Sequence, residues 1–484
     1  MGTLEIIKKF IESNWIIERG AREVLERLPV RLRYGISYGP TFRSWLGFLK
    51  ESEQWNEDRL EAYQVEQLRD LLMHAGGNVP YYRKLFGEYG FKPERTQSLD
   101  DLKVLPYTDK EIVRDNIEGF LAENVPRKSL FRKATSGSTG IPLALYSDKA
   151  AEEKHWATVV HAWSKVGYTP GSRILTIWGN ITRGGKDNLP FKRYANQLII
   201  SHHYFDSERW IKQYLLMIRQ FRPEIIFSLP STLSSFSNYI NEGLIPPLDG
   251  IKACIVVNEA LYSWQRKLIE ENLNTRVFST YGMVEKNVYA SGCVSSSRYH
   301  VYPQYGVPEV FQVGDGIFEI VGTGLINYAQ PLVRYRTFDR GVLNATKCPA
   351  CNSLYKSLNL IEGRLGEVLI DKNGKIHTPI DVGVDSKAFE DIKLFQFYQD
   401  TPGKILLRLV KKRACSDSIA IRINEELMTV LGLWGKENKM EIEIVFVDEV
   451  NRSPSGKFTI VEQKLDVRRF LNTKEVTASC ASHG

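Results

Sequence analysis

Apolar residues at helical spacing mark the beginning of the chain. Ile7, Phe10, Ile11 and Trp15 recur every three or four positions, with Lys and Glu residues between them. This pattern predicts an amphipathic helix. A helix that lies on a membrane surface would show the same spacing, but here the polar face mixes both signs of charge. The pattern therefore favours a helix packed against the body of the protein.

A second charged helix is predicted over residues 50–75. The string NVPYYRKLF ends it at Pro80, because proline cannot continue the hydrogen bonding of a helix. Together these segments predict a helical N-terminal part over residues 1–95. In the string LPYTDKEIVRDN that follows, Thr108 is the expected N-cap of a short helix. Glu111 stands three positions later, as in a capping box.

Short apolar runs alternate with helical patterns in the middle of the chain. One such helix is marked by Trp210, Tyr214, Ile218 and Phe221, which share a face. Strands that alternate with helices predict βαβ units and a parallel or mixed sheet. The runs predicted as strands are Arg173–Trp178, Glu224–Ser228, Ala253–Val257 and Arg276–Ser279.

The pattern changes again near residue 300, where Gly-rich turns such as FQVGDGIFEIVGTG predict an antiparallel or barrel-like lobe. The later string KLFQFYQDTPGKILLRLV predicts a hairpin with a Thr-Pro-Gly turn, followed by a helix over 416–431 and a strand at MEIEIVFV. We therefore expect an α/β protein. It has a large N-terminal domain of mixed sheets, helices and a barrel-like lobe, and a small mobile α+β domain at the C-terminus. The predicted boundaries are 96–362 for the core and 363–484 for the C-terminal domain.

Composition and charge limit the classes of protein. Of the 484 residues, 43 % are apolar and 25 % are charged, as in soluble globular proteins, which excludes general disorder. The 64 Lys and Arg against 57 Asp and Glu give a net charge of +7, which permits an anionic ligand but does not indicate nucleic-acid binding. No apolar run is long enough to span a membrane, and Glu5 interrupts any signal-peptide core, so we expect a cytoplasmic protein.

The string ATSGSTGIP at residues 134–142 is the strongest single candidate for chemistry. Its glycines let the backbone approach phosphate oxygens closely, while successive N–H groups and hydroxyls donate to the anion. It is not a Walker A loop, because it lacks the Gly-Lys-Ser/Thr ending. A plain surface turn is the alternative, and the string alone does not decide between the two.

The cysteines suggest a metal site. Cys348 and Cys351 form a Cys-x2-Cys knuckle that contains a proline, and Cys293 with His300 stands upstream, which together make one Cys3His set. Such a set suits tetrahedral Zn²⁺ in a structural role, because the protein fills all four positions. The alternative is four reduced side chains with no metal. Basic residues do not cluster around the knuckle beyond Lys347 and Lys356, which argues against nucleic-acid binding through it.

Four further strings occur in a distinctive order: STYGMVE (279–285), RYRTFDRG (334–341), EGRLGE (362–367) and NRSPSGKF (451–458). With the Ser/Thr/Gly string, this set resembles the adenylate-forming, AMP-binding superfamily of acyl-CoA synthetases. It is most similar to the phenylacetate–CoA ligase branch, which includes relatives from capsular polysaccharide biosynthesis. NVPYYRKLF and LPYTDKEIVRDN are similar to the same branch, so the resemblance covers roughly residues 50–470.

The resemblance implies an ATP-dependent ligase that forms AMP. A carboxylic acid attacks ATP to give an acyl-adenylate and pyrophosphate, with Mg²⁺ present, and the acyl group then passes to an acceptor. Coenzyme A is the usual acceptor in this family, and an amine is the alternative for polysaccharide-associated relatives. The branch often carries a zinc site between these same two loops, in agreement with the Cys3His set. A non-catalytic, zinc-containing scaffold is the competing hypothesis.

The resemblance also assigns roles. Lys457 would bridge the carboxylate and the α-phosphate, Glu285 would hold Mg²⁺, and Asp339 would accept both ribose hydroxyls. Tyr281, beside Gly282, would stack on adenine, and Arg364 would reach the ribose or phosphate. The β- and γ-phosphates would lie on Ser136, Gly137, Ser138, Thr139 and Gly140, and the adenine and acyl pockets beside Asn258 and Glu259.

Some positions depart from the family pattern, and several have structural alternatives. Val284 stands where the family usually has Thr before its Glu, and Gly366 stands where an acidic hinge residue is usual. Asp339 has an alternative role as the ion-pair partner of Arg336 or Arg340. Glu285 could instead cap a helix, Lys457 could be a solvated loop residue, Arg364 a structural ion-pair partner and Tyr281 a core residue.

Overall fold

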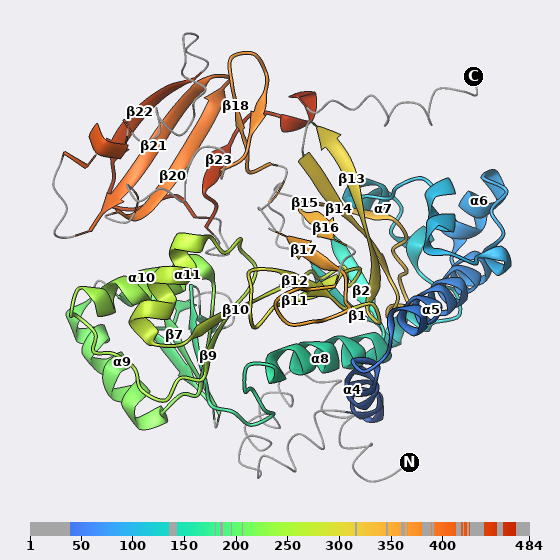
Figure 1. Cartoon of the computed structure of the whole chain (residues 1–484), viewed down its shortest axis with the longest axis horizontal. Coiled ribbons are helices and arrows are strands. Elements are labelled where there is room, and N and C mark those ends of the chain that lie inside the picture. Colours follow the sequence, from blue (N-terminus) through green and yellow to red (C-terminus); the bar gives the residue numbers. More distant parts are fainter. Residues whose placement is uncertain are drawn as a thin grey trace.

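The computed structural model describes most of the chain (Figure 1). The described residues are 39–134, 143–179, 181–183, 187–194, 196–205, 207–314, 317–344, 347–359, 364, 366–379, 389, 392–412, 418–419, 421–423, 425, 440–452 and 458–470. The helix predicted around Ile7 and Trp15 lies outside this part, as does most of the helix predicted over 416–431.

The N-terminal half of the chain contains most of the helices, whose ends follow from local chemistry. The second helix begins at Glu57 rather than near residue 50, because Asn56 caps it by accepting from the N–H of Arg59. Pro80 begins a new helix, as it can at a first helical position. The α-helices are α4 (Pro40–Ser52), α5 (Glu57–Asn78), α6 (Pro80–Glu88), α7 (Lys110–Asp115), α8 (Lys149–Ser164), α9 (Glu208–Phe221), α10 (Pro230–Asn241) and α11 (Ser263–Leu273).

The predicted cap of α7 was wrong by one residue. Asp109 is the N-cap and accepts from the N–H groups of Glu111 and Ile112. The Thr108 hydroxyl instead donates to the carbonyl of Val333, 2.8 Å away, because a tertiary contact competes for it. Short 3-10 turns occupy Pro93–Arg95, Leu99–Val104, Glu118–Phe120, Arg127–Ser129, His202–Tyr204 and Val467–Phe470.

A ten-stranded sheet forms the centre of the protein. Its strands are β3 (Ile174–Trp178), β6 (Phe191–Arg193), β7 (Gln197–Ser201), β8 (Ile225–Ser228), β9 (Ala253–Val256), β10 (Arg276–Gly282), β11 (Tyr289–Gly292), β12 (Tyr299–Val301), β16 (Val342–Asn344) and β17 (Ser357–Asn359). They lie in the order β16-β17-β12-β11-β10-β9-β8-β3-β7-β6. The run from β10 to β7 is parallel. The predicted strands and the mixed α/β class are confirmed.

Helices cover both faces of the parallel part. Cys254 and Val256 of β9 face a core built with α9, α10 and α11. The alternate residues Ala253 and Ile255 face a second core, which includes Phe42 of α4 and side chains of α8. This period of two, with apolar residues on both faces, is why the strands appear in the sequence as continuous apolar runs.

Smaller antiparallel sheets join the large one. They are the pair β1 (Phe131–Ala134) and β2 (Ala144–Ser147), the pair β4 (Thr182–Arg183) and β5 (Asp187–Asn188), and the sheet of β13 (Gly306–Gly314), β14 (Ile317–Gly324) and β15 (Tyr335–Arg340). The last sheet is the antiparallel lobe that the Gly-rich turns predict. The hairpin β1–β2 carries the Ser/Thr/Gly string in its connection.

The C-terminal part forms its own sheet, in the order β22-β21-β20-β23, on the far side of the molecule from α5 and α6 (Figure 1). Its strands are β20 (Ile392–Thr401), β21 (Lys404–Lys411), β22 (Glu441–Phe446) and β23 (Val461–Gln463), and β18 (Leu369–Ile370) pairs with β19 (Ile376–His377) beside it. The predicted hairpin is β20–β21. Tyr262, the N-cap of α11, and Trp264, in its first turn, pack against the core of this sheet. None of the helices in the described part is long and apolar enough to cross a membrane.

Candidate active site and metal centre

Several predicted residues lie at the carboxyl ends of the parallel strands. Tyr281 and Gly282 end β10, and Asn258 and Glu259 follow β9. Ligands of α/β proteins bind outside this edge of the sheet. Asn258 is exposed and has a φ of +67°, a left-handed conformation that Asn tolerates better than most residues. The edge therefore brings together residues that the sequence separates.

Asp339 lies at the centre of the candidate site. The hydroxyl of Tyr281 donates to Asp339 Oδ2 at 2.9 Å, and Arg364 Nε lies 3.6 Å from Asp339 Oδ1. Asp339 and Arg364 also form an isolated antiparallel bridge, so their backbones are adjacent. Arg336, an alternative partner for Asp339, pairs instead with Glu319 at 2.6 Å. The arrangement leaves a carboxylate held from two sides beside a strand end.

Glu285 lies close to this group. It accepts a 3.4 Å hydrogen bond from the Tyr335 hydroxyl and is partly buried. Burial raises the pKa of its carboxyl, although the Arg364 charge acts in the opposite direction. No helix begins at Glu285 in the described chain, so the helix-cap alternative fails there. Lys110 is a further basic group here. Burial and the charge of Arg364 lower the pKa of its ammonium, and the Glu285 carboxylate opposes this shift.

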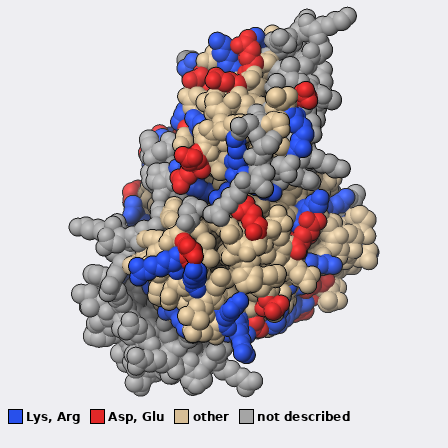
Figure 2. Space-filling model, turned by 90° about the vertical axis from the view of Figure 1, so that its left-hand side faces the viewer, with Lys and Arg blue, Asp and Glu red and all other residues tan. Residues whose placement is uncertain are grey.

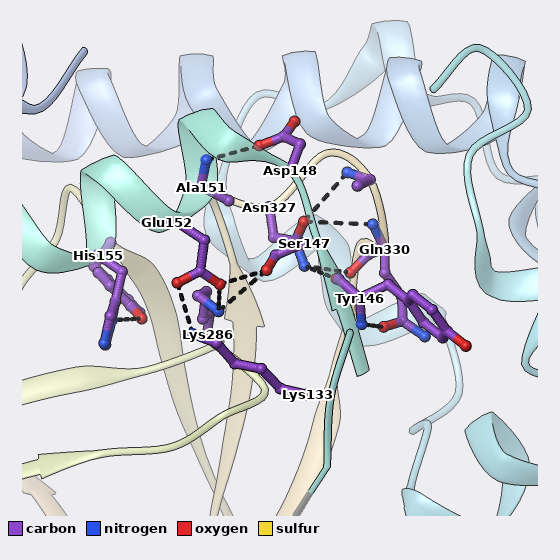
Figure 3. A network of polar contacts seen from close by, with 12 residues as sticks. Lys133, Tyr146, Ser147, Asp148, Ala151, Glu152, His155, Lys286, Asn327 and Gln330 are labelled. Carbon is purple, nitrogen blue, oxygen red and sulfur yellow. Dashed lines mark hydrogen bonds and ion pairs between the residues drawn. The ribbon is translucent and has the colours of Figure 1, made fainter. Parts of the chain in front are cut away.

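A charged network adjoins Glu285 in the sequence (Figure 3). Lys286, only 3 % exposed, places its Nζ 2.8 Å from Glu152 Oε1 of α8. Lys133 of β1 contacts the other oxygen of Glu152 at 2.6 Å, and the Ser147 hydroxyl of β2 donates to Oε1 at 2.5 Å. Glu152 therefore joins both strands of the hairpin β1–β2 to the segment that carries Glu285.

Two of the strongest sequence predictions lie outside the described residues. They are the loop of Ser136, Gly137, Ser138, Thr139 and Gly140, and Lys457. The positions next to them are described. Lys133 and Ala134 precede the loop on β1, and Phe458 directly follows Lys457.

The Glu259 carboxylate is occupied by two backbone donors. Its Oε2 accepts from the N–H of Ser231 at 3.0 Å, and its Oε1 accepts from the N–H of Phe458 at 2.9 Å. Burial raises the pKa of Glu259, while these hydrogen bonds act to lower it. Glu259 thus connects the start of α10 with the C-terminal part, and its predicted contact with nucleotide or acyl group stays a prediction.

The Cys3His set comes together in space. The ligand atoms of Cys293, His300, Cys348 and Cys351 all lie within 4.8 Å of one another, and Cys351 Sγ is 3.2 Å from His300 Nε2. Sulfurs bound to one tetrahedral zinc are about 3.8 Å apart, given Zn–S bonds of about 2.3 Å. The donor set and its spacing therefore fit a zinc ion. The knuckle turns through Asn352, with a φ of +61° and an N–H that donates to the Cys348 carbonyl.

The sequence did not point to Glu152, Lys286 or Lys110. Glu152 and Lys286 are 134 positions apart, so no local pattern pairs them. Lys286 follows a motif residue directly, which was the one available signal. Basic and acidic side chains are interspersed on the face of the described chain seen in Figure 2, so the positive net charge is not gathered there.

Comparison with known proteins gives three results. Residues 369–464 match the protein-family model of the CapK C-terminal domain. A phenylacetate–coenzyme A ligase of Pseudomonas putida is 30 % identical over 66 % of this chain and 74 % of its own length. The fold is similar to that of 2-hydroxyisobutyryl-CoA ligase in the postadenylation state, with a TM-score of 0.67, 17 % identity and coverage of 87 % of this chain and 93 % of the other. The same ligase in its thioesterification state gives a TM-score of 0.52 over the same shares.

Proposed function

Because the chain belongs to the phenylacetate–coenzyme A ligase family, we propose that it joins a carboxylic acid to ATP as an acyl-adenylate and then transfers the acyl group to coenzyme A. The observation that carries this proposal is the convergence of Tyr281, Asp339 and Arg364 beside Glu285 at the carboxyl edge of a parallel sheet. In this proposal these side chains supply a carboxylate for the ribose, an aromatic ring for the adenine, a cation and a ligand for Mg²⁺.

Asp339 accepts hydrogen bonds from the two ribose hydroxyls of ATP. Tyr281 and Arg364 hold the Asp339 carboxylate in place, at 2.9 Å and 3.6 Å. Tyr281 is 8 % exposed and packs in an apolar cluster at the end of β10, and the proposal places the adenine against its ring. Because a hydrogen-bonded acceptor is already oriented, little ordering remains when the nucleotide binds.

The chemical step joins two anions that repel. The carboxylate oxygen of the acid attacks the α-phosphorus of ATP, the bond from that phosphorus to the bridging oxygen breaks, and pyrophosphate leaves with its electron pair. Glu285 would hold the Mg²⁺ that accompanies ATP, since this hard cation prefers oxygen ligands. In this proposal Lys457 supplies a point charge that attracts both the acid and the α-phosphate.

Transfer follows from the acyl-adenylate. The thiol of coenzyme A attacks the acyl carbon, loses its proton, and displaces AMP. We propose that the C-terminal sheet with its loops, called the lid below and predicted to begin at residue 363, rotates between the two steps. In this proposal the rotation removes Lys457 from the site.

The Cys3His cluster binds one structural zinc ion in this proposal. Cys293 and His300 lie on the segment after Glu285, while Cys348 and Cys351 lie on the segment after Asp339. An ion held by all four would tie these two segments together and so keep Glu285 and Asp339 in register.

The test is product analysis with the purified protein, ATP, Mg²⁺ and a panel of aromatic, hydroxy and short aliphatic acids, with coenzyme A or amines as acceptors. The proposal expects AMP and an acyl-CoA for at least one acid. If amides form and no thioester does, the acceptor is an amine and not coenzyme A. If no acid gives AMP, the non-catalytic scaffold is the remaining hypothesis.

A further inference from the structure

One carboxylate joins the core of the protein to the lid. Glu259 uses one oxygen for the Ser231 N–H at the start of α10 and the other for the Phe458 N–H in the lid, at 3.0 and 2.9 Å. Hydrogen bonds to a charged acceptor are about twice as strong as neutral ones. Both of these donors are backbone groups, and the Ser231 hydroxyl and the Arg452 guanidinium also act on this carboxylate by lowering its pKa.

The lid end of this contact is fixed to the lid sheet. Phe458 is buried and forms an isolated antiparallel bridge with Arg452, which closes the segment between them. Gln396 of β20 donates to the carbonyls of Asn451 and Thr459, at 2.9 and 3.1 Å. Both ends of the segment that contains Lys457 are thus attached to one sheet, and a bond at Phe458 fixes that sheet relative to the core.

The lid rests on the start of α11, where Tyr262 and Trp264 pack against the core of the lid sheet, and on α10. Besides the Glu259 contact, Arg452 Nη1 donates to the Ser231 hydroxyl at 3.3 Å. Farther along the helix, Lys393 Nζ of β20 donates to the Tyr239 hydroxyl at 3.4 Å. The contact at Phe458 is the shortest of the three and lies next to Lys457 in the chain.

The position of the lid agrees with the first half of the reaction. The TM-score is 0.67 against 2-hydroxyisobutyryl-CoA ligase in its postadenylation state and 0.52 against the same ligase in its thioesterification state, over equal shares of both chains. Because both structures are of the same ligase, we attribute the difference between the scores to the position of the C-terminal domain relative to the core.

We propose that Glu259 is a positioning residue that latches the lid in the adenylation position through the Phe458 N–H, and that this bond opens when the lid turns for transfer. The inference rests on the proposed function for its two half-reactions. Glu259 acts on Lys457 through the backbone and touches neither reacting atom in this role.

The substitution Glu259→Gln isolates the latch. A glutamine keeps the size of the side chain but has one accepting oxygen, so its NH2 group faces one of the two N–H donors. We expect adenylation, followed as ATP–pyrophosphate exchange, to fall in kcat by roughly ten- to a hundredfold, the effect of one lost charge-assisted hydrogen bond. KM for ATP should change little. Transfer from a synthetic acyl-adenylate to coenzyme A should keep its rate or become faster.

The matched control is Tyr239→Phe, which removes the lid contact at the far end of α10 and leaves the Phe458 segment intact. It should leave both half-reactions near the wild-type rate. Two results for Glu259→Gln would overturn the latch. One is a loss of both half-reactions to the same degree, and the other is ATP–pyrophosphate exchange at the wild-type rate.

A second measurement does not depend on activity. Hydrogen exchange followed by mass spectrometry should show faster exchange in Glu259→Gln for peptides that contain Phe458, and unchanged exchange in β8 and β9. Unchanged protection of Phe458 would overturn the latch even if activity falls. If the wild type activates no acid, the proposed function fails. The hydrogen-exchange measurement then still decides whether Glu259 holds the lid.

Discussion

The hydroxyl of Tyr281 donates a 2.9 Å hydrogen bond to Asp339, 58 residues later in the chain. Tyr281 ends a strand of the central sheet, and Asp339 belongs to the antiparallel lobe, so the bond joins two separate sheets. The site therefore depends on how these sheets pack.

Asp339→Asn should weaken the binding of ATP. An amide leaves one accepting oxygen for two ribose hydroxyls, so we expect KM for ATP to rise by roughly ten- to a hundredfold, as for a lost hydrogen bond to a charged group. Titration calorimetry with ATP and Mg²⁺ measures the loss directly. Arg336→Lys is the matched control, because Arg336 pairs with Glu319, and equal loss in both variants would contradict a ribose role for Asp339.

Glu152→Gln should destabilise the fold by about 3 kcal/mol, because it leaves the buried Lys286 ammonium without its carboxylate. Lys133→Gln should cost less than about 1 kcal/mol, since the Lys133 side chain is 42 % exposed and its pair is screened by water. Urea unfolding of both variants gives the comparison. Equal losses would mean that Lys286 does not depend on Glu152.

The ion pair of Glu152 with Lys286 also predicts that stability depends on pH. Burial alone would raise the pKa of Glu152, but Lys286, Lys133 and Ser147 lower it from 4.5 to about 2. A lowered folded-state pKa gives stability that is present above the ordinary pKa and is lost as the pH falls through that range. Between about pH 5 and about pH 3, the wild type should therefore lose more stability than Glu152→Gln. Parallel losses in urea unfolding would contradict the assignment.

Removal of zinc should destabilise the protein. Metal analysis of the purified chain should find about one zinc per chain, and Cys348→Ser should lose the metal and lower the unfolding temperature, because a structural ion contributes its binding free energy to the fold. Cys480→Ser, outside the Cys3His set, is the control. A metal-free protein of undiminished stability would rule the site out.

Sequence patterns predicted much of this protein, for identifiable reasons. The strands of the parallel sheet are buried on both faces, so each is a continuous apolar run that can be recognised without its partners. Tyr281, Asp339, Arg364 and the Cys3His set could be named as candidates because they lie in short strings of recognisable spacing, and their roles stay predictions.

The rest depended on tertiary contacts. Thr108 was expected to cap α7, yet the carbonyl of Val333, 225 residues away, takes its hydroxyl. Two of the partners of Glu259 are backbone N–H groups, which every residue except proline has, so no residue type reveals these two. Lys286 similarly finds Glu152 only through the packing of α8 against the central sheet.

ATP–pyrophosphate exchange across a panel of carboxylic acids, with wild type and Lys457→Ala side by side, tests the account most directly. We expect the wild type to catalyse ATP–pyrophosphate exchange with at least one acid. In Lys457→Ala the exchange rate should fall by roughly a hundredfold or more, because one charge must serve both repelling reactants. Exchange that is absent with every acid, or equal in the two proteins, would contradict it.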